Sequence, residues 1–585
     1  MDNTFFPFGT ELKTNYQLYD VAKFDSIREM LDMAASEAGD RTAYKFKEKG
    51  EVREVTYSEF HATVNALGTG LSLMGCGGVH TAMIGENSYN WILSYLTILC
   101  GDGVFVPVDK DLLIDEILHI LTRSDCEAVF VSRAYADKLR SRFDEVPAVK
   151  KVICFGCEGM TEDDRFVTAE TVIKLGADAL AAGDRSYLDA KSDLRALKML
   201  VFTSGTTGIA KGVMLSEHNL VSSVYYGMQI SSVHTTSLSV LPYNHTYESV
   251  CDLLVAIHHH STLCINENLR AVAENMKLYK PDYMMLVPLF AENLYKKIWN
   301  TAETTGKAGG LRTLIKVSQA MRKVGIDKRK TLFKSILDVF GGNMIKIVCG
   351  GAPIRPEIAA FFDAIGIILI NGYGITECSP LVSVNRDFFN DYRTVGVPLS
   401  CINVKIHEPN AAGEGEVLVR GDVVMLGYYK DPEATAEAIQ NGWFYTGDYG
   451  KTDDGGRILI TGRKKNLIVL KNGKNIYPEE IERYMGNIPQ ISEVVVYSVK
   501  NESGEEVALC AEMFLDEELV GTLDAKERLE LMKKEVGNIN RKLPSHKRVV
   551  KIKIRQTEFE KTTSRKIRRV NIGVNDDEIA EDASL

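Results

Sequence analysis

The sequence predicts an α/β fold with a large N-terminal domain, in which mixed or parallel sheets are flanked by helices, and a small α+β C-terminal domain. A chain of 585 residues exceeds what one hydrophobic core usually supports, so we expect at least two domains. Apolar runs rich in β-forming residues alternate with helix-like segments, which favours parallel sheets. The polar stretch 462–466 ends this pattern, and a shorter α+β pattern follows. The predicted domains are therefore residues 1–464 and 465–585.

The elements that carry this prediction occur in order along the chain. The predicted strands are Ala128–Val131, Leu197–Phe202, Val213–Leu215, Ile345–Val348 and Ile367–Ile370. A helix-like segment, Pro356–Ala364, separates the last two strands, as expected where a helix connects parallel strands. Asp576, Asp577, Glu578, Glu581 and Asp582 make the C-terminal tail acidic, and this composition predicts disorder.

Composition narrows the function classes. The formal net charge is -10 and no basic bias runs through the chain, so a nucleic-acid partner is not expected. Residues 1–16 lack the basic start and apolar core of a secretory signal, which favours a cytoplasmic location with eleven reduced cysteines. Cys154 and Cys157 form a lone C-x-x-C pair, which is weak evidence for a zinc or redox site. No run of 18 apolar residues predicts a membrane span, whereas peripheral membrane contact stays open.

The segment 203–212 reads Thr-Ser-Gly-Thr-Thr-Gly-Ile-Ala-Lys-Gly and predicts a clamp for the phosphates of ATP. Glycines let backbone N–H groups approach an anion, hydroxyls add donors, and Lys211 adds a mobile positive charge. The segment is not a Walker A loop, because Lys211 lies between Ala210 and Gly212 rather than before Ser or Thr. An ordinary hairpin turn is the alternative, although turns seldom combine so many hydroxyls with a lysine.

Further motifs make the chain resemble the adenylate-forming enzymes, a superfamily that includes acyl-CoA synthetases, adenylation domains of peptide synthetases and luciferases. After the loop, the matching blocks occur in the family's order: 350–353 (Gly-Gly-Ala-Pro), 371–377 (Asn-Gly-Tyr-Gly-Ile-Thr-Glu), 445–448 (Tyr-Thr-Gly-Asp), 462–465 (Gly-Arg-Lys-Lys) and 561–567 (Lys-Thr-Thr-Ser-Arg-Lys-Ile). The resemblance to long-chain fatty acid–CoA ligases implies an AMP-binding domain over 1–464. It also implies a mobile C-terminal domain over 465–585 that carries a catalytic lysine.

The resemblance implies an ATP-dependent acid–thiol ligase. Coupling a carboxylate to AMP replaces an oxide leaving group by a phosphate monoester, and the thiol of coenzyme A then takes the acyl group. The implied cofactors and substrates are ATP, Mg²⁺, coenzyme A and a small carboxylic acid. Positioning and electrostatic stabilisation should carry the first step, because charge gathers on the equatorial oxygens of the α-phosphate and on departing pyrophosphate.

The resemblance assigns roles residue by residue. The nucleotide-binding set is Thr203, Ser204, Gly205, Thr206, Thr207, Lys211, Gly351, Ala352, Pro353, Asn371, Gly372, Tyr373, Gly374, Asp448 and Arg463. Within this set, Tyr373 would stack on adenine and Asp448 would accept hydrogen bonds from the ribose hydroxyls. The catalytic set is Thr376 at the α-phosphate, Glu377 holding Mg²⁺, and Lys566 between the acid and the α-phosphate.

One position departs from the family pattern. The residue before the catalytic lysine is commonly Gly, and here it is Arg565. Long-chain members tolerate other residues there, so the assignment of Lys566 stands, with Lys561 as the nearest competing lysine.

The acid substrate is suggested by two segments. The stretch 241–248 resembles the acyl-pocket segment, with Tyr243 lining the pocket and His245 at its gate, and it holds no acidic residue before Glu248 to pair with an amino-acid ammonium. The stretch 296–342, with a helix-like 315–324 and a basic 328–330, resembles an insertion of long-chain acyl-CoA synthetases. An apolar acid, a medium- or long-chain fatty acid, is therefore expected; branched and aryl acids are not ranked.

The acceptor and the hinge come from the segments after the domain boundary. Lys465 stands where the family's pivot lies, and Gly473, Lys474 and Asn475 resemble the segment that faces the thiol-bearing arm. Coenzyme A is favoured. An acyl carrier protein presents the same arm and stays open as an acceptor. A non-catalytic ligand-binding relative is the third alternative, although such a relative should have lost Lys566, Glu377 or Asp448, and all three are present.

Overall fold

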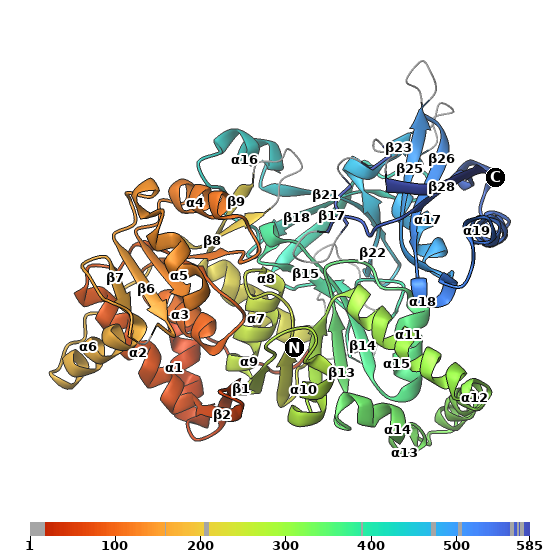
Figure 1. The fold of residues 1–585 in the computed structure, drawn as a ribbon. Helices are drawn as coiled ribbons and strands as arrows, with labels where there is room; N and C mark the ends of the chain where they lie inside the picture. The colour runs from red at the N-terminus through yellow and green to blue at the C-terminus, as the bar shows by residue number, and fades with distance from the viewer. Residues whose placement is uncertain are drawn as a thin grey trace. The chain divides into compact units, whose positions relative to one another are not determined.

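The structure is a computed structural model that describes residues 18–157, 159–203, 210–387, 390–469, 475–500, 506–561, 567–569, 572–573 and 578–585 (Figure 1). The chain divides into two compact units. The first comprises Met1–Val404, Val419–Phe444 and Asp454–Ile458, and the second comprises Lys405–Leu418, Tyr445–Asp453 and Leu459–Leu585. The predicted domain boundary at Lys465 remains a prediction, because each compact unit is made of several separate segments of the chain.

The first unit contains an eight-stranded sheet of order β19-β9-β8-β4-β3-β5-β6-β7. Its strands are β3 (His80–Ile84), β4 (Val104–Val108), β5 (Ala128–Ser132), β6 (Lys151–Phe155), β7 (Phe166–Thr168), β8 (Leu197–Thr203), β9 (Lys211–Ser216) and β19 (Gly427–Tyr428). Strands β3 to β8 pair in parallel, whereas β9 is antiparallel to both β8 and β19. The helices of this stretch of chain are α1 (Ile27–Ala38), α2 (Tyr57–Leu73), α3 (Tyr89–Cys100), α4 (Ile114–Arg123), α5 (Arg133–Arg140) and α6 (Ala169–Ala181).

A nine-stranded sheet of order β16-β15-β14-β13-β12-β10-β11-β1-β2 also lies in the first unit. Its strands are β1 (Thr42–Glu48), β2 (Glu51–Thr56), β10 (Thr236–Ser239), β11 (Thr262–Ile265), β12 (Tyr283–Leu286), β13 (Lys346–Cys349), β14 (Ile368–Gly374), β15 (Leu381–Val384) and β16 (Val397–Pro398). From β14 through β12 and β10 to β11 the strands run parallel. The helices along it are α7 (Glu217–Ile230), α8 (Thr246–Glu248), α9 (Val255–His258), α10 (Val272–Tyr279), α11 (Pro288–Thr304), α12 (Ala308–Lys323), α13 (Arg329–Leu332), α14 (Lys334–Leu337) and α15 (Pro356–Ile365).

Local sequence explains why α15 lies between β13 and β14. Pro356 stands at the first helical position, where its missing N–H leaves nothing unsatisfied. Gly366 ends the helix in the left-handed conformation, with φ of 104°, which favours glycine. The buried side chains of α15 include Phe361 and Phe362, so one face of this connecting helix joins the core.

A five-stranded sheet comprises β17 (Ile402–His407), β18 (Gly415–Gly421), β20 (Ile439–Gln440), β21 (Trp443–Thr452) and β22 (Ile458–Arg463), and α16 (Pro432–Ala438) precedes β20. The second unit adds a two-stranded sheet of β23 (Ile468–Val469) and β24 (Asn475–Ile476) and a four-stranded sheet of order β25-β26-β27-β28. The latter strands are β25 (Ile491–Lys500), β26 (Glu506–Leu515), β27 (Val549–Arg555) and β28 (Ile579–Ser584). Helices α17 (Pro478–Met485), α18 (Glu517–Val520) and α19 (Ala525–Asn540) complete this α+β unit.

The fold class predicted from the sequence is confirmed, and so are its strands and the helix between the last two. Two details are wrong. Residues Ile579–Ser584 of the acidic tail are not disordered but form β28, which pairs antiparallel with β27. The prediction of eleven reduced cysteines is wrong for two of them: Cys154 and Cys157, both buried near the end of β6, are joined in a disulfide, and the other nine cysteines are free. Among the described residues, no helix combines the length and the apolar character that a membrane crossing requires.

Candidate functional site

The carboxyl ends of four parallel strands bring the predicted motifs of the first unit together. Strands β10, β12, β13 and β14 are neighbours, and Leu286, Cys349 and Asn371 align across β12, β13 and β14. The segment 241–248 follows β10, the segment 350–353 follows β13, and the segment 371–377 lies at the end of β14. Ligands of open α/β sheets bind at this edge, so the topology places the acyl and adenine motifs on one side of the molecule.

Tyr247 connects two of these motifs directly. Its hydroxyl donates to the backbone oxygen of Val348 at 2.9 Å, and its ring lies against Gly350. A Cβ atom at position 350 would come within 2.9 Å of the ring, so glycine is required for this contact. The segment after β10 therefore packs against the start of the Gly-Gly-Ala-Pro loop, whose Gly351, Ala352 and Pro353 are exposed.

A sharp turn after β14 presents Thr376 and Glu377. A Cβ atom at position 374 would lie 2.3 Å from the backbone oxygen of Pro380, so only glycine fits this close approach. Thr376, Glu377 and Cys378 then form a single 3₁₀ turn, in which Thr376 and Glu377 are half-buried and Cys378 is buried. The two predicted catalytic side chains of this segment thus lie next to the end of β14.

Two side chains of β14 have the features of a nucleotide contact. Tyr373 and Asn371 are both buried, and the two residues lie on one strand two positions apart, so they face the same side of the sheet. The Oδ1 atom of Asn371 is buried and has no hydrogen-bond partner among the described residues. Because buried polar atoms in folded proteins are almost always paired, this acceptor is suited to a donor supplied by a ligand.

The phosphate-loop motif is described only at its base. Strands β8 and β9 pair with Thr203 opposite Lys211, and Arg123 of α4 donates to the backbone oxygen of Ala210 at 2.8 Å. The two predicted strands around the loop are therefore confirmed. The loop residues Ser204, Gly205, Thr206 and Thr207 lie outside the described residues, and their phosphate contacts remain predictions.

Tyr428 links the base of this loop to Glu377, a link that the sequence did not predict. The Lys211 ammonium lies 4.9 Å from the centre of the Tyr428 ring, within the range of a cation–π contact. The Tyr428 hydroxyl donates to Oε1 of Glu377 at 3.0 Å. Burial, together with the charge of Glu377, raises the pKa of Tyr428, so its hydroxyl stays protonated as a donor.

Replacement of Tyr428 by Phe should lower kcat/KM for ATP by about tenfold, since a hydrogen bond to a charged group contributes about 1.5 kcal/mol. The ring under Lys211 would remain. Initial rates of acid-dependent pyrophosphate release measure the effect. Tyr429→Phe is the matched control, because the Tyr429 hydroxyl donates to Asp125 instead, at 2.6 Å. Equal effects of the two variants would contradict a role for the contact between Tyr428 and Glu377.

The acyl-pocket candidates occupy different surroundings. Tyr243 is buried, its ring lies edge-on to Trp91, and its hydroxyl accepts from Ser239 at 3.0 Å. His245 is half-buried and precedes the first turn of α8. Within the segment 241–248, Tyr243 thus lies in the packed core, whereas His245 is partly exposed to solvent.

Two carboxyl groups lie at the end of the segment 241–248 and just after it, those of Glu248 and Asp252, and both are fully buried. The Ser239 hydroxyl lies 2.5 Å from Oε1 of Glu248, and the Ser237 hydroxyl contacts both oxygens of Asp252 at 3.0 and 3.1 Å. Burial raises the pKa of Asp252 to about 7, and burial together with the nearby Asp252 also raises the pKa of Glu248 well above its usual value. These groups are engaged in the core, and their raised pKa values disfavour a fixed negative charge.

In the second unit, Asp448 lies among several charged partners. It is buried, and Arg463 Nε lies 3.0 Å from its Oδ1. Lys464 Nζ lies 2.7 Å from Oε2 of the buried Glu416, although the Lys464 side chain itself is exposed. Lys465 follows in the same 3₁₀ turn, and desolvation together with the charge of Arg463 lowers its pKa. The predicted ribose-binding pair and the predicted pivot therefore lie close together in one unit.

The C-terminal lysines differ in what the structure describes. Lys561 is largely buried and forms ion pairs with Glu493 and with Glu558. Lys566, Arg565, Gly473 and Lys474 lie outside the described residues, and Asn475 is described only as part of β24. The pairing of Lys561 with two carboxylates makes it a poor candidate for a mobile catalytic cation.

The comparisons with known proteins agree with this geometry. The model of the AMP-binding enzyme family matches residues 31–429, more than half of the chain. The chain belongs to the AMP-binding enzyme family. The model of the AMP-binding enzyme C-terminal domain matches residues 465–577. The prediction of an adenylate-forming enzyme of the acyl-CoA synthetase class, an acid–thiol ligase, is confirmed.

Relatives of this AMP-binding enzyme include ligases with two kinds of acceptor. Long-chain-fatty-acid–CoA ligase FadD15 of Mycobacterium bovis is 28% identical over 508 residues, which cover 82% of this chain and 81% of that protein. Long-chain-fatty-acid–[acyl-carrier-protein] ligase AEE15 of Arabidopsis thaliana is 27% identical over 553 residues, which cover 81% and 75%. The crystal structure of the anthranilate CoA ligase AuaEII with anthranoyl-AMP has the same fold, with a TM-score of 0.74, 18% identity and coverage of 94% and 96%.

Proposed function

We propose that this AMP-binding enzyme activates a medium- or long-chain fatty acid as acyl-AMP and transfers the acyl group to the thiol of coenzyme A, releasing AMP and pyrophosphate. The observation that carries the proposal is the gathering of the acyl, adenine and acidic motifs at the carboxyl edge of β10, β12, β13 and β14. The unpartnered acceptor of Asn371 lies on the last of these strands and suits the amino group of adenine.

The first step needs positive charge and donors around the α-phosphate. A carboxylate oxygen of the acid attacks the α-phosphorus, and the bond from that phosphorus to the bridging oxygen of pyrophosphate breaks. Thr376 would donate to the α-phosphate, Lys211 would neutralise the leaving pyrophosphate, and Lys566 would lie between the two reactants. Glu377 offers the carboxylate oxygens that Mg²⁺ prefers, and the ion would supply charge neutralisation for the triphosphate when bound.

The second step transfers the acyl group. The thiolate of the acceptor attacks the carbonyl carbon of acyl-AMP, and AMP leaves as a phosphate monoester. Gly473, Lys474 and Asn475 would line the passage of the thiol-bearing arm. The acceptor is coenzyme A in this proposal, in line with relatives such as FadD15.

A carrier protein is the second candidate acceptor, because the Arabidopsis relative is named as an acyl-carrier-protein ligase. The experiment that tests the proposal is acid-dependent pyrophosphate release across a set of acids, followed by detection of the thioester with coenzyme A and with an acyl carrier protein side by side. Thioester formation on the carrier protein alone would replace the proposed acceptor. No pyrophosphate release with any acid would overturn the proposed activation.

Replacement of Asn371 by Leu should raise KM for ATP by about tenfold while leaving the melting temperature unchanged, since it removes an acceptor that has no partner among the described residues. Asn385→Leu is the matched contrast. Asn385 is buried and donates to Asn371 O at 3.2 Å and to Thr394 O at 2.8 Å, so its loss should lower the melting temperature. Thermal unfolding and ATP titrations of both variants test the assignment. A lower melting temperature with unchanged KM in Asn371→Leu would make its role structural.

Replacement of Lys465 by Pro should slow thioester formation more than acyl-AMP formation. Proline fixes φ, and one site must receive Lys566 in the first step and the segment around Gly473 in the second. The two half-reactions are measured separately, as pyrophosphate release and as thioester formation from acyl-AMP made beforehand. Lys465→Ala is the control, because it removes the charge and keeps the backbone free. If both half-reactions slow equally in the proline variant, the pivot lies elsewhere.

A further inference from the structure

Helix α12 (Ala308–Lys323) and the turn that follows it carry apolar side chains on the surface of the first unit. Leu314, Val317, Val324 and Ile326 are 38%, 44%, 73% and 45% exposed. Leu314, Val317 and the half-buried Met321 are spaced by three and four residues, so they lie on one face of α12, and Val324 continues that spacing. Leu311 and Ser318 are buried and lie beside Leu314 on the helix, three residues before it and four after it, so the stripe borders the face that packs on the protein. Val324, which lies farthest round the helix from Leu311, is the most exposed residue of the stripe.

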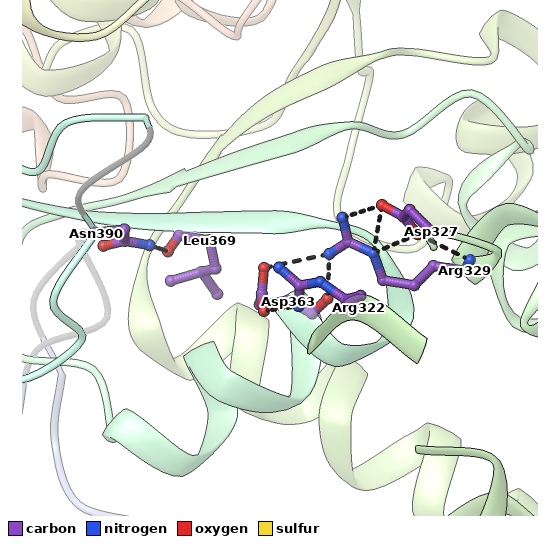
Figure 2. Close-up of polar contacts among 6 residues, drawn as sticks. All are labelled: Arg322, Asp327, Arg329, Asp363, Leu369 and Asn390. Carbon is purple, nitrogen blue, oxygen red and sulfur yellow. Dashed lines mark hydrogen bonds and ion pairs between the residues drawn. The ribbon is translucent and has the colours of Figure 1, made fainter. Parts of the chain in front are cut away.

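Arginine side chains hold this helix and turn in place (Figure 2). Arg322 lies 2.6 Å from the carboxylate of Asp363 on α15, and Arg329 donates to the backbone oxygen of Asp363 at 2.7 Å. Asp327 in turn lies 2.6 Å from Arg329. To the left in the same view, Asn390 donates to the backbone oxygen of Leu369 on β14, the strand that follows α15 in the chain. Asp327 and Asp363, the acidic residues near the turn, are thus paired with the two arginines.

Five lysines of this segment make no ion pair with any described residue, whereas Arg312 pairs with Glu303 and Lys334 with Asp338, just outside it. Between residues 305 and 336 the sequence has nine Lys and Arg residues and one acidic residue, Asp327, in a chain whose net charge is -10. The exposed side chains that make no ion pair or hydrogen bond with any described residue are those of Lys307, Lys316, Lys323, Lys328 and Lys330. The rest of the chain is more acidic than the average, so this segment is a local basic patch.

We propose that the stripe Leu314, Val317, Met321, Val324 and Ile326, together with these lysines, docks the enzyme on an anionic phospholipid bilayer. A helix that combines an exposed apolar stripe with unpaired lysines lies in the plane of a membrane interface, where the apolar side chains enter the acyl boundary. The long lysine stems reach past them, and the ammonium groups meet anionic headgroups. Because the lysines are positive and the headgroups of acidic lipids are negative, the enzyme should bind a membrane that contains acidic lipid more tightly than one without it. This binding does not depend on the proposed ligase reaction.

Sedimentation of the full-length protein with vesicles tests the proposal. The vesicles contain phosphatidylcholine alone, or phosphatidylcholine mixed with phosphatidylglycerol. The protein should bind the mixed vesicles at low salt, bind phosphatidylcholine vesicles at least about tenfold more weakly, and dissociate as salt rises. Lack of binding to the mixed vesicles, or equal binding to both compositions, would overturn the proposal.

Two sets of matched variants locate the surface. Lys316→Glu, Lys323→Glu and Lys328→Glu combined should weaken binding by about tenfold or more. Lys174→Glu, Lys191→Glu and Lys277→Glu combined make the same charge change at exposed lysines elsewhere in the first unit and should bind more tightly than the first set. Equal loss in the two sets would mean that overall charge, and not this surface, binds lipid.

The apolar stripe has its own control. Leu314→Ser, Val317→Ser and Val324→Ser combined should weaken binding even at low salt, whereas Leu175→Ser with Leu278→Ser, which are 42% and 45% exposed, should not. All substituted positions are exposed, so thermal unfolding should match the unmodified protein, and this measurement separates lost binding from lost folding. Unchanged binding of the stripe variant would overturn the insertion of apolar side chains.

Discussion

Replacement of Lys566 by Ala should lower the rate of acyl-AMP formation by about 10²-fold or more, the scale for removing one preorganised group that stabilises a transition state. The cation would lie between the carboxylate and the α-phosphate only while negative charge develops there. Thioester formation from acyl-AMP supplied directly should therefore survive. The two half-reactions are measured separately, by pyrophosphate release and by thioester formation with coenzyme A.

Lys561 provides the control for this prediction. Its ammonium is engaged by Glu493 and Glu558; burial opposes its charged form, but these ion pairs outweigh that effect and raise its pKa. Lys561→Ala should therefore leave acyl-AMP formation within a few fold of the unmodified enzyme and act, if at all, on stability. Equal loss of both half-reactions in Lys566→Ala would sink its assignment. A large, step-selective loss in Lys561→Ala would move the catalytic role to that lysine, and one in Arg565→Ala would move it to Arg565.

The parts of the site that the sequence predicted are those in which a motif follows a strand. Apolar runs identify β13 and β14, and the parallel order then requires the segments after Cys349 and around Asn371 to meet at one edge. No contact between side chains is needed for that argument. Chain order and strand direction account for where these two motifs lie, whereas their assignment to adenine came from the family resemblance alone.

The link through Tyr428 could not be predicted in this way. It depends on the antiparallel pairing of β19 with β9, in which Tyr428 stands opposite Val213, a residue far away in the sequence. Strand β19 has only two residues, too few to show the alternation of apolar and polar side chains that predicts a strand. A Gly-Tyr-Tyr sequence after an apolar stretch gives no sign that one hydroxyl reaches Glu377 and the next reaches Asp125.

Charge patterns failed where partners came from distant strands. The acidic tail predicted disorder, yet Asp582 pairs with Lys551 at 2.7 Å and Glu578 pairs with Arg555, so the basic strand β27 neutralises two of the tail's acidic residues. Likewise the exposed Lys464 pairs with Glu416, which lies on another strand. A charged segment stays disordered only when no opposite charge pairs with it, and the count of acidic residues in the tail did not include the basic residues of β27.

Lengthening a saturated acid should raise kcat/KM by up to about fourfold per added CH₂, from about 0.8 kcal/mol of transfer free energy, until the pocket is full. The segment that leads to the predicted pocket supports this expectation, because the carboxyls at its end and just after it, Glu248 and Asp252, are buried and hydrogen-bonded to serines. An amino acid would have to desolvate its ammonium with no fixed anion to receive it, so it should react far more slowly than a fatty acid of the same volume.

The measurement is kcat/KM for a series of saturated acids, an aromatic acid and an amino acid. A response that rises and levels off would give the depth of the pocket in CH₂ groups. A flat response, or a preference for the amino acid, would contradict a fatty-acyl pocket while leaving the adenylation chemistry untouched, since the latter depends on the edge formed by β13 and β14 rather than on the acyl segment.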